Sequence, residues 1–137
     1  MQQQAQQQVQ QPECRFCNSR PGRALIRGEH CFAGWDRHPV NPGHMLVIPY
    51  RHFPTYFDAT PEVKREMWEM VDRAKEIIER EHHPDGYNIG VNIGEHAGQS
   101  IMHLHIHIIP RYRGDVENPK GGIRGVIPAR QHYQLVP

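Results

Sequence analysis

The segment His-Leu-His-Ile-His-Ile-Ile at residues 103–109 restricts the fold more than any other part of the sequence, because histidine and aliphatic residues alternate along it. Successive side chains of a β-strand point to opposite faces of the sheet, so His103, His105 and His107 are expected to share one face. An ordinary amphipathic strand would carry Thr, Lys or Glu there more often than histidine. Imidazole changes its charge near pH 7 and serves as a nucleophile, a proton donor or a metal ligand. The segment therefore predicts a strand with catalytic or metal-binding side chains on one face.

One metal ion bound by all of these histidines is disfavoured. At about 3.3 Å per residue, His103 and His107 lie roughly 13 Å apart along a flat strand, which is too far for a shared ion. Neighbouring pairs, either His103 with His105 or His105 with His107, are still close enough to share one. A catalytic zinc site therefore stays open as an alternative to a histidine nucleophile.

Hydrophobic periodicity elsewhere predicts one long helix and several strands. The helix is expected over residues 60–82, because Thr60 suits the N-cap, Pro61 suits the first turn and apolar residues recur at helical spacing up to Ile78. Strands are expected where short apolar runs are bounded by turn residues, and a weaker pattern indicates a shorter helix. The strand segments are residues 31–36, 45–49, 87–93 and 102–109, and the shorter helix lies near residues 19–26. This mixture indicates the α+β class with an antiparallel sheet.

The 137 residues suffice for one domain, with a low-complexity glutamine-rich tail at residues 1–12 and an extended tail at residues 115–137. The formal net charge of +1 comes without a basic block, so long nucleic acid is not an expected partner. No apolar run reaches the roughly 20 residues that a membrane-spanning helix needs, so no membrane association is expected. The first residues have neither the basic start nor the apolar stretch of a secretory signal, and we expect a cytoplasmic location.

Two separated segments resemble the signature of the histidine triad (HIT) family. Residues 98–109, GQSIMHLHIHII, are similar to the family pattern G-Q-S-x-x-H-φ-H-φ-H-φ-φ, where φ is apolar. Residues 41–49, NPGHMLVIP, are similar to its P-G-H-x-L-V-x-P segment, and a helix is expected between the two motifs. The likeness covers residues 13–114, which we therefore expect to form a HIT domain. It implies a HIT-like fold with about five antiparallel strands, one long helix and one short helix.

In that family the middle histidine of the triad attacks the α-phosphorus of a nucleotide, and the resemblance gives this role to His105. A neutral imidazole is a good nucleophile near pH 7, and two displacements replace one difficult step. By the same resemblance, His107 contacts the phosphate and assists charge or proton transfer. His44 is expected to contact the triad without contacting the substrate. The implied activity is that of a nucleotide hydrolase or nucleotidyl transferase, which cleaves at the α-phosphate through a nucleotidyl-histidine intermediate.

The resemblance also implies a set of residues that bind the nucleotide. Asp36 takes the position of a carboxylate that accepts hydrogen bonds from the ribose hydroxyls, and Asn92 that of an amide near the scissile bond. Gly98, Gln99 and Ser100 precede the histidine strand, where backbone N–H groups and the Ser100 hydroxyl could hold phosphate oxygens. No residue specific for a particular base is evident.

Cys14 and Cys17 form a C-x-x-C pair that supplies two thiolates, and a tetrahedral zinc needs about two more nitrogen or sulfur ligands. Some members of the family hold zinc with such a pair, with the histidine that ends an I-P-x-x-H segment and with the first histidine of the triad. The matching residues here are His52 and His103. The resemblance thus implies a structural zinc, and it gives His103 a role apart from catalysis. No organic cofactor is expected.

The substrate branch stays open, because residues 109–115 resemble the members that cleave dinucleoside polyphosphates whereas Asn92 resembles those that cleave nucleoside phosphoramidates. Two other functions stay open as well. One is a zinc-dependent metallohydrolase that uses the triad as metal ligands, and the other is a nucleotide-binding protein without turnover. Members of the family usually form homodimers through strand and helix pairing, so we expect a homodimer that acts on a small nucleotide.

Overall fold

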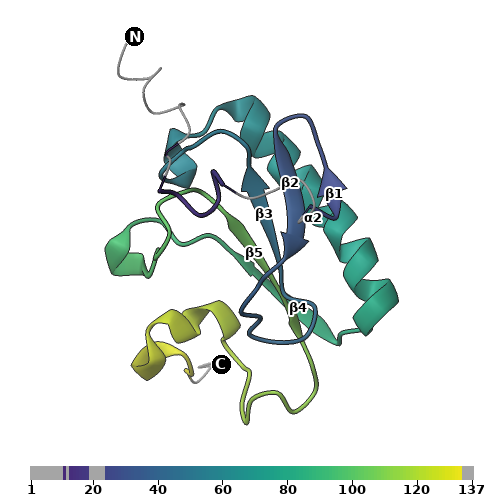
Figure 1. The fold of residues 1–137 in the computed structure, drawn as a ribbon. Coiled ribbons are helices and arrows are strands. Elements are labelled where there is room, and N and C mark those ends of the chain that lie inside the picture. Colours follow the sequence, from purple (N-terminus) through teal and green to yellow (C-terminus); the bar gives the residue numbers. More distant parts are fainter. Residues whose placement is uncertain (1–10, 12, 19–23, 134–137) are drawn as a thin grey trace.

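The computed structural model describes residues 11, 13–18 and 24–133, which form one antiparallel sheet with a long helix against one face (Figure 1). The sheet has five strands in the order β1-β2-β3-β5-β4, and each neighbouring pair is antiparallel. The strands are β1 (Ile26–Arg27), β2 (Cys31–Trp35), β3 (Met45–Pro49), β4 (Gly86–Gly90) and β5 (Ile106–Arg111). The α+β class with a five-stranded antiparallel sheet is confirmed.

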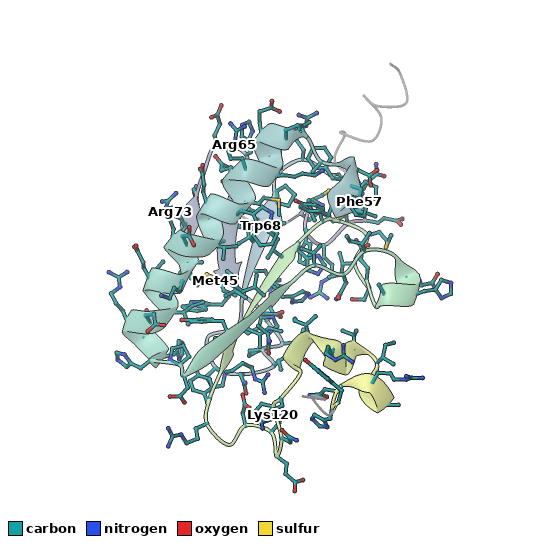
Figure 2. The ribbon with its side chains drawn as sticks, turned by 180° about the vertical axis from the view of Figure 1, so that it is seen from behind. Met45, Phe57, Arg65, Trp68, Arg73 and Lys120 are labelled. Carbon is teal, nitrogen blue, oxygen red and sulfur yellow. The ribbon has the colours of Figure 1, made fainter. Side chains whose placement is uncertain are left out.

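Helix α2 (Pro61–His82) occupies the segment in which the sequence predicts the long helix. The side chain of Thr60 caps its first turn by accepting a backbone N–H, and a proline stands at the first helical position. The helix ends at His83, which has a left-handed φ of 51°. Charged residues such as Arg65 and Arg73 are exposed on its outer side (Figure 2). Within the described ranges, no helix is both long and apolar enough to cross a membrane.

The strands carry apolar side chains on both faces of the sheet, and β3 shows the division. Met45 and Val47 belong to the main core, which lies between the sheet and α2. Leu46 and Ile48 alternate with them and pack on the opposite face, in a smaller cluster with Phe16. The segment around Phe16 therefore covers the sheet face that α2 leaves open.

Three of the predicted strands have different bounds in the structure, and the first, β2, ends one residue early at Trp35. Strand β4 begins and ends earlier than expected, at Gly86–Gly90, and β5 begins only at Ile106. Residues 102–105 lie outside the ladder because the N–H of Leu104 donates to the carbonyl of Phe53 at 2.7 Å instead of to a neighbouring strand. The two segments do form an antiparallel pair, with Ile89 opposite Ile108.

The short helix predicted near residues 19–26 is wrong where the structure describes it. Residues 24–26 are not helical, because the N–H of Leu25 donates to the carbonyl of Ala33 at 2.8 Å and Ile26 pairs with Ala33 at the sheet edge. Residues 19–23 lie outside the described residues. The other helical segments of the described part are short 3-10 helices: η2 (Tyr56–Asp58), η3 (Glu95–Ala97), η4 (Gly122–Val126) and η5 (Pro128–Arg130).

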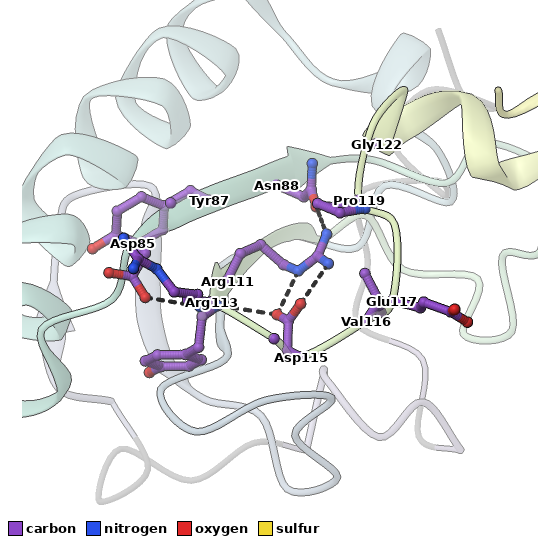
Figure 3. A pocket seen from close by; sticks show the side chains of 13 residues that line it. Asp85, Tyr87, Asn88, Arg111, Arg113, Asp115, Val116, Glu117, Pro119 and Gly122 are labelled. Atoms are coloured by element: carbon purple, nitrogen blue, oxygen red, sulfur yellow. Dashed lines mark hydrogen bonds and ion pairs between the residues drawn. The ribbon is translucent and has the colours of Figure 1, made fainter. Parts of the chain in front are cut away.

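An ion pair anchors the chain just after β5 (Figure 3). The guanidinium of Arg111 donates to both carboxylate oxygens of Asp115 at 2.8 Å and to the side chain of Asn88 on β4 at 2.6 Å. Asn41 donates to the same carboxylate at 2.8 Å, which ties the β2–β3 loop to this corner. Beyond Asp115 the chain up to residue 133 contains η4 and η5, so it is not extended throughout. Most of the glutamine-rich tail lies outside the described residues, and the predicted domain limits stay predictions.

Candidate functional site

His103, His105 and His107 lie on the sheet face away from α2. Ile106 and Ile108 belong to the core beneath the helix, so the imidazoles that alternate with them point to the other side. The ring centroids of His105 and His107 are 4.9 Å apart. His103 is fully buried, His105 is 7% exposed and His107 is half-buried. The exposure of the imidazoles thus rises along the segment.

A backbone carbonyl fixes which nitrogen of His105 carries a proton. Nδ1 of His105 lies 2.9 Å from the carbonyl oxygen of His103, which can only accept, so Nδ1 donates. The neutral ring then has its free lone pair on Nε2. Burial lowers the pKa of His105, against smaller opposing effects of this hydrogen bond and of Asp36. The ring is therefore held neutral with an unprotonated Nε2, the form of imidazole that can act as a nucleophile.

A chain of hydrogen bonds orients His107 in the opposite sense. The N–H of Val40 donates to Nδ1 of His44 at 3.1 Å, so the proton of neutral His44 resides on Nε2. That Nε2 lies 3.0 Å from Nδ1 of His107 and 3.4 Å from a carboxylate oxygen of Asp36. Because His44 donates, Nδ1 of His107 accepts and Nε2 of His107 keeps its proton. Burial, followed by the neighbouring His105 and His44, lowers the pKa of His107 to about 4.

His105 and His107 line a cavity of about 280 Å³ together with most of the residues predicted to bind a nucleotide. Asp36, half-buried, lines one part, and Asn92 and Ser100 line another. Apolar side chains complete the walls. The cavity is lined by Arg15, Phe16, Asp36, Arg37, His38, Val40, His44, Leu46, Asn92, Ser100, Ile101, His105 and His107. A carboxylate, an amide, a hydroxyl and the oriented imidazoles of His105 and His107 therefore face one small cavity.

Gly98 and Gln99 lie in the adjoining loop and do not line this cavity. The N–H groups of both donate within the loop, that of Gly98 to Glu95 and that of Gln99 to Gly94. The amide of buried Gln99 donates to the carbonyl of Pro54 at 2.6 Å and accepts from the N–H of Gly94 at 2.9 Å. Gly98 has a φ of +92°, which favours glycine. These contacts shape the loop, and Ser100 is the member of the tripeptide that reaches the cavity.

Cys14, Cys17, His52 and His103 come together as a second group, with their ligand atoms all within 4.8 Å of one another. Nδ1 of His103 lies 3.2 Å from Nδ1 of His52 and 3.4 Å from Sγ of Cys14. Sγ of Cys17 lies 3.2 Å from Nδ1 of His52. A tetrahedral zinc with ordinary bond lengths separates two nitrogens by about 3.3 Å and a nitrogen from a sulfur by about 3.6 Å. The residues therefore fit a zinc ion in both chemistry and spacing.

His103 is oriented for such a role by its other nitrogen. Nε2 donates to the carbonyl of Pro49 at 2.8 Å, which leaves the lone pair on Nδ1, the atom that faces the cysteines. Burial lowers the pKa of His103 to about 4, so the ring is neutral as a metal ligand must be. Within the described chain, Asp36, His44 and His107 form another group with metal-ligand spacing, and His105 belongs to neither group.

Several residues at the cavity were not predicted from the sequence, and two of them come from the segment with the paired cysteines. Arg15 and Phe16 lie between the paired cysteines and line the same cavity as His105. A signal was present, because a C-x-x-C that docks on His103 brings its two middle residues next to the neighbouring triad position. That inference needed the three-dimensional arrangement of the loop, which periodicity does not give.

The comparisons with known proteins agree with this arrangement. The HIT domain family model matches residues 18–114. The AP-4-A phosphorylase of Mycobacterium tuberculosis is 37% identical over 95 residues, which cover 69% of this chain and 49% of that protein. The bis(5'-adenosyl)-triphosphatase of Dictyostelium discoideum is 40% identical over 99 residues, which cover 72% of this chain and 66% of that protein. The chain thus spans about half the length of the mycobacterial relative.

A solved structure extends the likeness to the fold. A Zn-bound histidine triad family protein from Mycobacterium smegmatis superposes with a TM-score of 0.67 and 32% sequence identity, over 75% of this chain and 78% of that one. The sheet order, the single long helix and the two motifs all lie inside the matched region. The chain therefore belongs to the HIT family.

Proposed function

We propose that this protein is a nucleotide hydrolase or nucleotidyl transferase that cleaves at the α-phosphate and forms a nucleotidyl intermediate on His105. The orientation of His105 carries the proposal: its Nδ1 is engaged by the carbonyl of His103, and the ring lines the cavity with Nε2 unprotonated. In the first step a bond forms between Nε2 and the α-phosphorus while the bond to the leaving group breaks. In the second step an acceptor oxygen attacks that phosphorus and releases His105.

His107 donates a hydrogen bond that stabilises the charge developing on the leaving group. Its Nε2 carries hydrogen because its Nδ1 accepts from His44, so His107 can donate to an oxygen or a nitrogen of the substrate. The acceptor of the second step is water in a hydrolase. The name of the mycobacterial relative, a phosphorylase, points to phosphate as an alternative acceptor with the same intermediate.

The nucleotide is held by residues that line the cavity. Asp36 is proposed to accept hydrogen bonds from the ribose hydroxyls, Asn92 to contact the scissile bond, and Ser100 to donate to a phosphate oxygen. Gly98 and Gln99 contribute by shaping the loop that presents Ser100. Both relatives named above are called after substrates that join two adenosines through phosphates, which favours a dinucleoside polyphosphate over a phosphoramidate.

The metal proposal is a structural zinc ion. Cys14, Cys17, His52 and His103 fit it by distance and donor type, and the zinc-bound relative supports the metal's identity. When bound, the ion supplies a rigid link between the N-terminal segment and the residue two positions before His105. The chain itself provides catalysis, and an organic cofactor is not part of the proposal.

We propose that the protein forms a homodimer and is located in the cytoplasm. Strand β4 is an edge of the described sheet and carries Ile89, which is 39% exposed, while α2 carries Trp68, which is 41% exposed. Edge strands and exposed apolar side chains favour pairing with a second copy. None of the three cysteines forms a disulfide in the described chain, which suits a reducing compartment. The proposed partner is a small nucleotide rather than long nucleic acid.

The test is capture of the intermediate. The protein is incubated with diadenosine tetraphosphate and quenched in mild base, and we expect the mass of a nucleotide on the tryptic peptide that contains His105. His105→Ala should lose turnover by several orders of magnitude because the covalent route is removed. His96→Ala, which changes an exposed histidine outside the cavity, is the matched control and should keep full activity. Substantial turnover by His105→Ala refutes the mechanism.

The group Asp36, His44 and His107 favours one second candidate, a zinc-dependent metallohydrolase. In that case chelation abolishes activity at once and metal restores it, and no nucleotide becomes attached to His105. A nucleotide-binding protein without turnover would bind the same compounds and give neither product nor labelled peptide. The capture experiment combined with chelation separates all three.

A further inference from the structure

The loop that carries the two metal-binding cysteines is also a wall of the catalytic cavity. Cys14 and Cys17 face His52 and His103, whereas the residues between them, Arg15 and Phe16, line the cavity. The outer two residues of this four-residue segment thus belong to the proposed zinc site, and its inner two belong to the proposed nucleotide site.

Phe16 connects the two sites directly. Its ring packs edge-on against His103 at a centroid distance of 5.7 Å and an interplanar angle of 88°. The same ring packs against His105 at 5.0 Å and 74°. Phe16 is only 5% exposed, so its ring is enclosed by its neighbours. A shift of the ring would reach a metal ligand and the proposed nucleophile together.

Phe16 and the two thiols hold this loop against the sheet. The main core beneath α2 does not include it, and Phe16 belongs to the smaller cluster with Phe32, Leu46 and Ile48. The thiols of Cys14 and Cys17 provide its contacts with His52 and His103. A metal ion at those thiols would therefore add a further restraint on where Phe16 lies.

We propose that Phe16 is a positioning residue through which zinc binding and nucleotide binding strengthen each other. The inference rests on the function proposed above, because it needs both a zinc ion and a nucleotide in the cavity. Zinc fixes the loop, the loop fixes Phe16, and Phe16 closes the cavity around His105. A nucleotide that packs in the closed cavity in turn holds the cysteines in place for the metal. Linkage requires that each ligand raises the affinity for the other by the same factor.

The experiment uses the full chain, with zinc and AMP as the probes. The affinity for zinc is measured by competition with a fluorescent chelator, with and without saturating AMP. We expect zinc to bind at least about fivefold more tightly when AMP is present, the lower end of usual coupling between sites. The affinity for AMP, measured by calorimetry, should fall by the same factor when zinc is removed.

Phe16→Leu keeps an apolar side chain and all four metal ligands but removes the ring contacts, and it should bring the ratio of zinc affinities close to 1. Phe57→Leu changes a phenylalanine that is 73% exposed, and it should leave the ratio unchanged. Wild-type protein that binds both ligands with a zinc affinity independent of AMP overturns the coupling and leaves the proposed function intact. Zinc-loaded protein that does not bind AMP overturns both. The wild-type ratio decides the coupling even if Phe16→Leu does not fold.

Discussion

Glu66 lies outside the catalytic cavity, and replacing it with glutamine should destabilise the fold. Glu66 projects from α2 to the turn between β1 and β2, where its carboxylate accepts three backbone N–H groups. The distances are 2.9 Å from Glu29, 2.6 Å from His30 and 2.8 Å from Cys31. These N–H groups belong to a turn at the sheet edge, and the carboxylate satisfies all of them with a single charged group.

The magnitude follows from what glutamine can accept. One oxygen of Glu66 takes the N–H groups of His30 and Cys31, and the other takes that of Glu29. A glutamine oxygen can keep the first two without the charge, but its NH₂ then faces the Glu29 N–H, donor against donor. A hydrogen bond to a charged group contributes about 1.5–3 kcal/mol and a neutral one about 1 kcal/mol. Glu66 is half-buried and partly solvated, so we expect a loss of about 2 kcal/mol in the free energy of unfolding.

Urea denaturation at pH 7 measures the loss, and Glu76→Gln, at an exposed position of the same helix, should stay within about 0.5 kcal/mol of wild type. Burial alone would raise the pKa of Glu66, but the hydrogen bonds of His30, Cys31 and Glu29 outweigh it and lower the pKa. The extra stability is therefore present above the unfolded value of 4.5 and is lost as pH falls through the lower folded value. A Glu66→Gln protein as stable as wild type at pH 7, or a difference that does not shrink in acid, refutes this reasoning.

Three further predictions concern the sites. Ser100→Ala should lower kcat/KM by about tenfold through loss of one hydrogen bond to a charged oxygen, and steady-state kinetics with an unchanged value would remove Ser100 from the binding residues. Burial lowers the pKa of His107 to about 4, so this ring stays neutral down to that pH. Its protonation should therefore lower kcat/KM only at a pH well below 6.5. A fall in kcat/KM with a midpoint at about pH 6.5 that disappears in His107→Asn contradicts this prediction. Cys14→Ser should lose about one zinc per chain by elemental analysis, and unchanged metal content would exclude this zinc site.

The sequence was sufficient for the elements whose pattern is local. The period of the apolar residues and the Thr60 cap located α2, and the alternation along 103–109 located the apolar side chains that enter the core. The bond from Leu104 to Phe53, which delays the start of β5, joins residues far apart in the chain, and no local pattern carries it. The same holds for Glu66, a helix-surface glutamate by spacing alone, whose partners lie 35 to 37 residues away.

Two carbonyl groups orient the rings of His103 and His105 differently. Both residues lie on one side of the chain, and their sequence positions are equivalent. His103 donates from Nε2 to Pro49 and presents Nδ1 to the cysteines, whereas His105 donates from Nδ1 to the carbonyl of His103 and presents Nε2. The neighbouring histidines are thus held in opposite tautomers. His105 is absent from the group of ligand atoms that Cys14, Cys17, His52 and His103 bring within 4.8 Å of one another. The opposite tautomers and this grouping support the proposed roles of His103 as a metal ligand and His105 as a nucleophile, a distinction that identical residues in a sequence do not reveal.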